Sequence, residues 1–274
     1  MKTAVLLMAH GSPESPDEME EYLNLVMTKS RPTPEFIREM QARYATFGGK
    51  SPLLEITKKQ AEALEERLGI PVRVGMRHWR PFIRDVVDGI GCDRIIGIAM
   101  APHFSPVSVG AYHRALGEAT DLGLELVSQW HSEPKLLDAW AGRIDTSDNI
   151  LFSAHAVPTR VSEPYTTQIR ETIDGILARL GKRPEWGFAW QSRPNAPGTW
   201  TEPDVAEFLL SKGWNSVQVA PIGFVSDHAE VLFDLDHQLR VIAEENGVRF
   251  CRMEMLNDDP FLIDALEAVV RRVL

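Results

Sequence analysis

The chain contains almost no cysteine. Only Cys92 and Cys251 occur among its 274 residues, far apart and without the Cys-x-x-Cys spacing of a redox or zinc motif. A disulfide framework needs several paired cysteines, and a zinc ribbon or a four-cysteine iron–sulfur cluster needs four thiolates close together. The sequence therefore excludes a disulfide scaffold and predicts that no iron–sulfur cluster is bound.

Long apolar runs are also absent. No stretch of about 18 consecutive apolar residues, the length that crosses a bilayer, occurs in the chain. The apolar start at residues 1–8 is too short for that role and lacks the cleavage pattern of a signal peptide. We expect a cytoplasmic protein without a transmembrane segment, in which these first residues form a buried strand.

The chain also lacks an excess of positive charge. Its 29 Lys and Arg residues against 39 Asp and Glu give a net charge of -10. A non-specific nucleic-acid binder needs a basic face to offset phosphate charge, so nucleic acid is excluded as a partner. The acidic balance fits a solvated surface that keeps the protein soluble, and it is also compatible with attracting cations.

What the sequence does contain is a regular alternation of short β-rich runs and longer amphipathic ones. This pattern is typical of βαβ units and of a parallel sheet covered by helices on both faces. The expected strands are 3–8, 71–75, 94–100, 124–127, 149–153, 185–189, 216–220 and 248–252. The expected helices are 17–27, 34–47, 53–68, 107–121, 165–180, 204–211 and 229–245, with further helices starting near residues 134 and 260.

The two halves of the chain repeat one plan. Both halves contain a strand that ends in Ala-His, an Ala-Pro pair after the third strand, and an acidic residue before Pro at the start of the last helix. The matching pairs are 6–13 with 151–158, 101–104 with 220–224, and 133–139 with 259–265. The repeat predicts two similar Rossmann-like lobes, 1–145 and 146–257, and a last helix in 258–274 that packs back on the first lobe.

The repeat also predicts where a ligand binds. In open parallel sheets, ligands bind beyond the carboxyl ends of the strands. His10, His103, His155 and the loop after Ala220 all fall at such ends. We therefore expect the functional site in the cleft between the two lobes.

The segment 225–238 holds the densest set of side chains that could bind a metal. In a helix, Glu230, Asp234 and Gln238 would lie on one face, where carboxylates repel one another unless a cation or a proton lies between them. The alternative is an ordinary solvated acidic face. A lone strand-end histidine such as His155 is more often structural, but together with Glu230 it makes an open nitrogen and oxygen site suited to Fe2+, Co2+ or Zn2+.

Two loops have other candidate roles. The loop 47–52 superficially resembles a phosphate-binding loop, but the glycine that a Walker A motif requires is replaced by Tyr44. With Arg43 and Ser51, this loop either grips a carboxylate or is a simple turn between helices. The Trp-rich loop 190–200 either lies against a flat aromatic ligand or packs within its lobe.

Several longer motifs occur in one order along nearly the whole chain. They are GKSPL at 49–53, GMRHWRPFI at 75–83, APHFS at 101–105, FSAHAVP at 152–158, PYTTQ at 164–168, WQS at 190–192 and PIGFVSDHAE at 221–230. Through them the sequence resembles the ferrochelatases, and most closely the cluster-free bacterial type that acts on coproporphyrin.

The resemblance implies a fold, an activity and a set of substrates. The fold is a two-lobed α/β chelatase of class II type, and the activity is that of a lyase-type chelatase that inserts Fe2+ into a porphyrin in haem biosynthesis. Fe2+ and the porphyrin are substrates, no permanent cofactor is expected, and a downstream enzyme of the haem pathway is an expected partner. The expected porphyrin is coproporphyrin III, which would give coprohaem.

The resemblance also implies roles for individual residues. His155 and Glu230 would handle the metal and the pyrrole protons, and Asp234 would relay metal or protons away from them. The residues implied in binding the porphyrin or its carboxylate arms are Arg43, Tyr44, Ser51 and Tyr112, to which the sequence adds Trp190.

The sequence departs from the family pattern at three positions. Gln238 stands where an acidic residue is usual, so a full second metal site is not expected. Met27 aligns with an arginine that helps to hold the porphyrin, and Arg31 is the predicted substitute. His10 stands where close relatives have a tyrosine, and we expect its neutral imidazole to bind the porphyrin and be an axial ligand of the product iron.

Three alternatives stay open from the sequence. In the first, the porphyrin substrate is protoporphyrin IX instead of coproporphyrin. In the second, the enzyme is a chelatase that loads cobalt or nickel into a related tetrapyrrole. The third alternative belongs to another class. In it, the protein is a non-catalytic two-lobed carrier of haem or metal, with His10 as the iron ligand.

Overall fold

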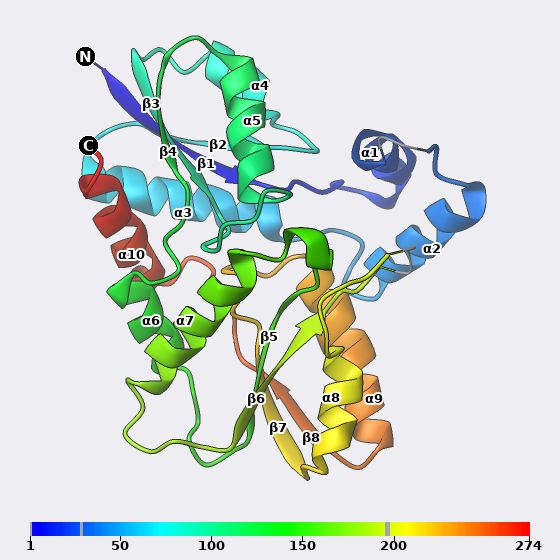
Figure 1. The fold of residues 1–274 in the computed structure, drawn as a ribbon. Coiled ribbons are helices and arrows are strands. Elements are labelled where there is room, and N and C mark those ends of the chain that lie inside the picture. Colours follow the sequence, from blue (N-terminus) through cyan, green and yellow to red (C-terminus); the bar gives the residue numbers. More distant parts are fainter. Residues whose placement is uncertain (1, 28–29, 195–197) are drawn as a thin grey trace.

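The computed structural model describes residues 2–27, 30–194 and 198–274, and its strands form two four-stranded parallel sheets (Figure 1). The first sheet has the order β2-β1-β3-β4, and the second has the order β6-β5-β7-β8. The strands are β1 (Thr3–Ala9), β2 (Val72–Met76), β3 (Arg94–Ala99), β4 (Gly123–Val127), β5 (Ile150–His155), β6 (Trp186–Gln191), β7 (Ser216–Ala220) and β8 (Arg249–Arg252). All eight expected strands are therefore present, and the expectation of an α/β fold with two parallel sheets is confirmed.

Helices cover the sheets and connect the strands. They are α1 (Met19–Val26), α2 (Pro34–Ala45), α3 (Leu53–Leu68), α4 (Ile83–Asp88), α5 (Val109–Ala119), α6 (Pro134–Ala141), α7 (Tyr165–Leu177), α8 (Val205–Lys212), α9 (Arg240–Glu245) and α10 (Pro260–Arg271). The sequence did not predict α4, because six residues are too few to show a helical period. The single helix expected over 229–245 is wrong in type, since Val231–Leu239 forms a π-helix that α9 continues.

The two sheets have the same internal order. Strands β2, β1, β3 and β4 of the first sheet occupy the same places as β6, β5, β7 and β8 of the second sheet. The central strands β1 and β5 are therefore equivalent, and the pairs Ala9-His10 and Ala154-His155 stand at their carboxyl ends. The repeat read from the sequence corresponds to this shared topology.

The apolar run of β1 is explained by burial on both of its faces. Val5 and Leu7 belong to the core that contains Leu64 of α3, whereas Leu6 and Met8 pack in a separate cluster with α4 and α5. Successive side chains of a strand point to opposite faces, so a strand covered on both sides needs apolar residues at every position. This burial fixes the register of β1, and with it the place of His10 just beyond its end.

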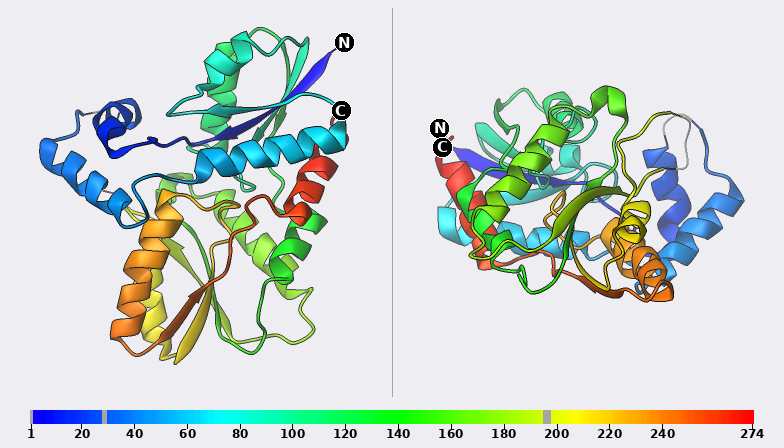
Figure 2. Two further views of the ribbon diagram at one scale, coloured as in Figure 1. Left: turned by 180° about the vertical axis from the view of Figure 1, so that it is seen from behind. Right: turned by 60° about the horizontal axis from the view of Figure 1, so that its bottom comes forward.

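The last helix of each half packs on the other half. Helix α6 lies against α7, where Leu137 fills the space left by Gly175, and a Cβ on Gly175 would lie 2.6 Å from Leu137 Cδ1. Helix α10 lies against α3 and α6 (Figures 1 and 2). Arg67 of α3 forms an ion pair with Asp264 of α10. The lobe boundaries at 145 and 257 stay a prediction.

One continuous apolar core joins the two sheets. It contains Val5 and Ile96 of the first sheet together with Phe152 and Val219 of the second, all with no exposed surface. Burying a side chain of this size stabilises the fold by about 1.5–3 kcal/mol, so the packing holds the sheets firmly relative to each other. The edges at which β1 and β5 end are fixed in the same way.

In the part of the chain that the structure describes, no helix combines the length and the apolar character needed to cross a membrane.

Candidate active site

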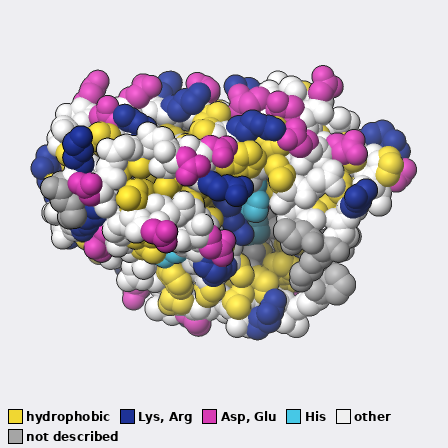
Figure 3. All heavy atoms as spheres, turned by 90° about the horizontal axis from the view of Figure 1, so that it is seen from above, with side chains coloured by type: hydrophobic (Ala, Val, Ile, Leu, Met, Phe, Trp, Pro, Cys, Tyr) yellow, Lys and Arg dark blue, Asp and Glu magenta, His cyan; other side chains and the backbone are white. Residues whose placement is uncertain are grey.

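A cavity of about 550 Å3 lies between the two halves, at the carboxyl ends of the strands. His10 after β1 and Ala101 after β3 line it from the first sheet, and His155 at the end of β5 and Phe224 after β7 line it from the second. Figure 3 shows a hollow on one face of the molecule in which basic side chains, Lys or Arg, lie beside histidine. The expected cleft at the sheet edges is therefore present.

His155 and Glu230 meet in this cavity. His155 Nε2 lies 3.3 Å from Glu230 Oε1, and His155 Nδ1 lies 2.6 Å from the carbonyl oxygen of Ala156. Because a carbonyl oxygen only accepts, we infer that Nδ1 donates to Ala156 and that Nε2 faces the carboxylate and the cavity. The structure thus brings together the two residues that the sequence paired.

The charges of this pair depend on each other. Burial alone would lower the pKa of His155, but the Glu230 carboxylate outweighs burial and raises it to about 9. Burial opposes ionisation of Glu230 as well, yet His155 and His228 hold the pKa of that carboxyl well below its usual range. At neutral pH the pair is therefore a histidinium beside a carboxylate.

A second histidine contacts the same carboxylate. His228 Nε2 lies 3.6 Å from Glu230 Oε2, and His228 Nδ1 lies 3.0 Å from the carbonyl oxygen of Ser226. Glu230 thus lies between two imidazoles. The sequence contained a signal for His228, which stands two residues before Glu230 in the same motif, but it did not assign the residue a role. Among the described residues, no three His, Cys, Asp or Glu side chains form a group that could hold a metal ion.

The π-helix separates the acidic stripe into two parts. Its hydrogen bonds run five residues along the chain instead of four, so side chains four residues apart are slightly offset around the axis and the offset grows with each further turn. Glu230 and Asp234 line the cavity, whereas Gln238 faces solvent. The expectation that all three residues share one face is therefore wrong.

Asp234 is poised to exchange a proton near neutral pH. Burial raises its pKa to about 6, and the nearby Glu230 carboxylate adds to the effect. The hydroxyl of Ser192 opposes it by donating a short hydrogen bond to the Asp234 carboxylate.

His10 lines the cavity from the first sheet. Its side chain is exposed toward the cavity, but the surrounding protein still removes it from bulk water, and this burial lowers its pKa to about 4. Glu230 opposes the shift, and Arg77 adds to it. The ring lies 4.6 Å from that of His78, measured between centroids. His10 is therefore neutral at pH 7 and presents a free imidazole.

Four of the residues expected to bind the porphyrin line the same cavity. Arg43 and Tyr44 reach it from α2, Ser51 from the following loop, and Tyr112 from α5. The Arg43 guanidinium lies 5.0 Å from the centroid of the Phe233 ring and forms an ion pair with Glu39 at 2.7 Å. Burial raises the pKa of Tyr44 and of Tyr112, so both hydroxyls remain donors at neutral pH.

Two of the expected residues lie elsewhere. Arg31 is exposed and is not among the residues that line the cavity. Trp190 is 3% exposed, donates from Nε1 to the carbonyl oxygen of Glu202 at 3.2 Å and packs edge-on against Phe188. The structure therefore gives Trp190 a packing role. Trp200, from the same loop, lines the cavity instead.

Arg77 is a cavity residue that the sequence reasoning did not single out. It follows β2 and lies 5.9 Å from the centroid of the Tyr112 ring. Within the described residues no carboxylate lies within ion-pair distance of it. The signal was its place in the motif at 75–83, where it stands one residue after the strand end.

The fold is that of the class II chelatases. It is similar to the structure of the sirohydrochlorin chelatase SirB from Bacillus subtilis subspecies spizizenii, with a TM-score of 0.59, 12% identity and coverage of 99% of this chain and 95% of SirB. It is also similar to CbiX, with a TM-score of 0.59, 13% identity and coverage of 98% and 99%. At these identities the similarity establishes the fold alone.

Sequence comparison identifies the family. The ferrochelatase family model matches residues 2–274. A ferrochelatase of Herpetosiphon aurantiacus is 37% identical over 98% of both chains, and a coproporphyrin III ferrochelatase of Geobacillus kaustophilus is 36% identical over 98% of this chain and 95% of its own. The chain belongs to the ferrochelatase family and is thus an enzyme, a lyase-type metal chelatase with Fe2+ and a porphyrin as substrates.

Proposed function

We propose that this enzyme inserts Fe2+ into coproporphyrin III to give coprohaem, with His155 and Glu230 as its catalytic residues. The observation that carries the proposal is the contact between His155 and Glu230 at the end of β5, inside a cavity that His10 lines from the end of β1. Relatives of about one-third identity are coproporphyrin III ferrochelatases of Geobacillus kaustophilus and Bacillus subtilis, at 36% and 35%.

The cavity provides donors for carboxylate arms. The guanidinium groups of Arg43 and Arg77 supply positive charge, and the hydroxyls of Tyr44, Ser51 and Tyr112 donate hydrogen bonds. Arg77 fits this role well, because its charge has no carboxylate partner among the described residues. Coproporphyrin carries four carboxylate arms and protoporphyrin two, so a second cation favours the former.

The His155–Glu230 pair couples metal binding to proton removal. Insertion of Fe2+ strips water from the metal and releases two pyrrole protons. When Fe2+ reaches the Glu230 carboxylate, it neutralises the charge that holds the pKa of His155 at about 9. His155 then gives up its proton and becomes a neutral base for a pyrrole N–H. Asp234, with a pKa of about 6, accepts protons from this side of the cavity.

His10 acts on the product. Its neutral imidazole binds iron as an axial ligand, because burial keeps its pKa at about 4. In this arrangement the porphyrin lies between the Ala-His ends of β1 and β5, with His155 and Glu230 on one face and His10 on the other.

We also infer that the enzyme acts in the cytoplasm, binds no iron–sulfur cluster and hands its product to a downstream enzyme of the haem pathway. Both cysteines, Cys92 and Cys251, are free thiols, as is usual in a reducing compartment.

The test compares both substrates under anaerobic conditions. Purified enzyme is given Fe2+ with coproporphyrin III or protoporphyrin IX, and insertion is followed by absorbance. We expect a higher kcat/KM with coproporphyrin III, and a loss of about 100-fold or more in His155→Ala and Glu230→Gln, the scale of general acid–base catalysis. Near wild-type rates in both variants would contradict the residue assignment. Tight haem binding without any turnover would instead favour a carrier, and preference for Co2+ with a reduced tetrapyrrole would favour another chelatase.

A further inference from the structure

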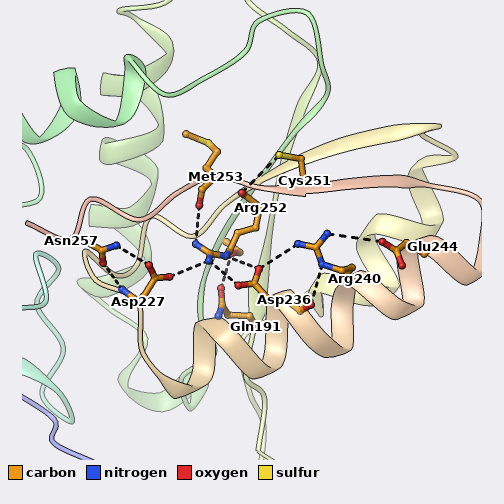
Figure 4. Close-up of polar contacts among 10 residues, drawn as sticks. Gln191, Asp227, Asp236, Arg240, Glu244, Cys251, Arg252, Met253 and Asn257 are labelled. Atoms are coloured by element: carbon orange, nitrogen blue, oxygen red, sulfur yellow. Dashed lines mark hydrogen bonds and ion pairs between the residues drawn. The ribbon is translucent and has the colours of Figure 1, made fainter. Parts of the chain in front are cut away.

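A partly buried ionic cluster lies beside the π-helix (Figure 4), and its residues do not line the cavity. Arg252, the last residue of β8, binds Asp236 with two parallel hydrogen bonds, from Nε to Oδ1 and from Nη2 to Oδ2, both 2.7 Å long. The same guanidinium lies 3.1 Å from Asp227 Oδ1, in an ion pair that lacks hydrogen-bond geometry. One arginine therefore joins two carboxylates from different parts of the chain.

The cluster is shielded from solvent. The side chains of Arg252, Asp227 and Asp236 are 12%, 19% and 24% exposed. Arg240 approaches Asp236 at 3.8 Å, but it is 39% exposed and belongs to the next helix, α9. Without Arg252 the two carboxylates would be left with little compensation, and an uncompensated buried charge is strongly unfavourable.

The two carboxylates flank Glu230 in the sequence. Asp227 stands three residues before Glu230, and Asp236 stands six residues after it, inside the π-helix. A π-helix usually extends over a single turn, whereas this one spans nine residues, so it needs support from the rest of the fold. Arg252 supplies that support on both sides of Glu230 with one planar group.

Other contacts aim Asp227 at Arg252. The backbone N–H of Asp227 donates to Asn257 Oδ1 at 2.8 Å, and Asn257 Nδ2 donates to Asp227 Oδ2 at 2.8 Å. Gln60 of α3, which is completely buried, donates to Ser226 Oγ at 2.9 Å and to the carbonyl oxygen of Asn257 at 2.6 Å. The segment before Glu230 is thus held by side chains from both halves of the chain.

We propose that Arg252 is a positioning residue of this enzyme. Its guanidinium fixes the segment 227–236 and thereby the distance of Glu230 from His155, on which metal transfer depends. This inference rests on the proposed function of Glu230. It requires arginine, because a lysine ammonium is a point charge that cannot make the paired bonds to Asp236 and also reach Asp227.

The test is Arg252→Lys, with Arg249→Lys as the matched control. Arg249 lies on the same strand, but its side chain is 78% exposed and pairs with Asp148 at 3.4 Å, away from the cluster. In Arg252→Lys we expect kcat for iron insertion to fall about tenfold to 100-fold and KM for Fe2+ to rise, since a misplacement of about 1 Å has effects of this size. The Kd of Arg252→Lys for the porphyrin is expected to stay within about twofold of wild type. The same holds for kcat, both KM values and the porphyrin Kd of Arg249→Lys.

A second readout separates positioning from general stability. Amide hydrogen exchange at residues 225–236 is expected to be faster in Arg252→Lys, with the exchange of β1 and β5 unchanged. Asp236→Asn removes the charge-paired contact but keeps Arg252 beside Asp227, and it is expected to show a smaller change in the same direction. If Arg252→Lys does not fold, Asp236→Asn replaces it as the variant that tests the inference.

Two outcomes would overturn the inference. One is a folded Arg252→Lys enzyme with wild-type kcat and wild-type KM for Fe2+. The other is an equal loss in Arg249→Lys. A wild-type enzyme that inserts no iron would overturn the proposed function instead, and the exchange measurement would still decide whether Arg252 fixes the segment.

Discussion

His10 and His155 stand at equivalent positions of the two halves, yet their pKa values move in opposite directions. Each follows an alanine at the end of a central strand, and each lines the same cavity. Burial lowers the pKa of His10 to about 4, whereas the adjoining Glu230 carboxylate overcomes burial and raises that of His155 to about 9. The comparison teaches that the repeat sets the place of each imidazole, and that the nearest charge sets its chemistry.

The largest expected effect comes from removing that charge. In Glu230→Gln, the pKa of His155 should fall well below about 9, because Glu230 is the main effect that opposes burial, while the Ala156 carbonyl and Asp234 still raise it. NMR titration of the histidine ring protons measures it, with His113, whose pKa is lowered by burial and does not depend on Glu230, as an internal reference. A His155 pKa that stays near 9 would mean that another group protonates it.

The pH dependence of metal binding sharpens the same comparison. Since the pKa of His155 is raised, the proton on it competes with the metal below about pH 9 and not above it. The apparent Kd for Zn2+, used in place of Fe2+ to avoid oxidation, should fall about tenfold for each pH unit from 7 to 9 if one proton is displaced. Calorimetric titration at several pH values measures this slope. A Kd that is flat over this range would show that no proton leaves.

A substitution at His10 tests the other half of the comparison. His10→Phe should remove the proposed axial ligand of the product iron but leave the residues of the opposite, inserting face unchanged. We therefore expect kcat to change less than about fivefold, which is far less than the effect of losing a catalytic base. The absorption spectrum of the bound product should shift, because an axial imidazole sets the ligand field of the iron. An unchanged spectrum would exclude His10 as the ligand.

The smallest effect is expected at Gln238. Its side chain faces solvent beyond the cavity, so Gln238→Glu should alter KM for Fe2+ less than about twofold. Asp234→Asn is the contrasting variant, because Asp234 lines the cavity and titrates near pH 6. Equal effects of the two substitutions would mean that the π-helix does not separate the acidic stripe into two parts.

Much of the architecture could be predicted from the amino-acid sequence. The strands are recognisable because parallel strands buried on both faces read as continuous apolar runs, as β1 does. The two Ala-His pairs mark equivalent strand ends, and so they locate the cavity. Arg43, Tyr44, Ser51 and Tyr112 are implied by the resemblance to the ferrochelatases, and all four line it.

The errors have physical causes. The apolar spacing of 231–239 suits a helix, but it does not by itself distinguish a π-helix from an α-helix. The sequence places Trp190 against the ligand because aromatic side chains serve both as packing and as stacking surfaces, and only its burial against Phe188 separates the two roles. Arg77 lies in the motif at 75–83, but an arginine in a loop has no periodicity that marks it as a cavity residue.

The sequence by itself determined the two parallel sheets, their common plan and the place of His155 at a strand end. These features are local or periodic, so they can be recognised from the order of the residues alone. Only the tertiary structure decided that Glu230 lies 3.3 Å from His155, that His228 contacts the same carboxylate, and that Gln238 faces away. The contact of Glu230 with His155 joins residues far apart in the chain, and the orientations of His228 and Gln238 depend on the local backbone and its packing, which the periodicity of the sequence does not determine.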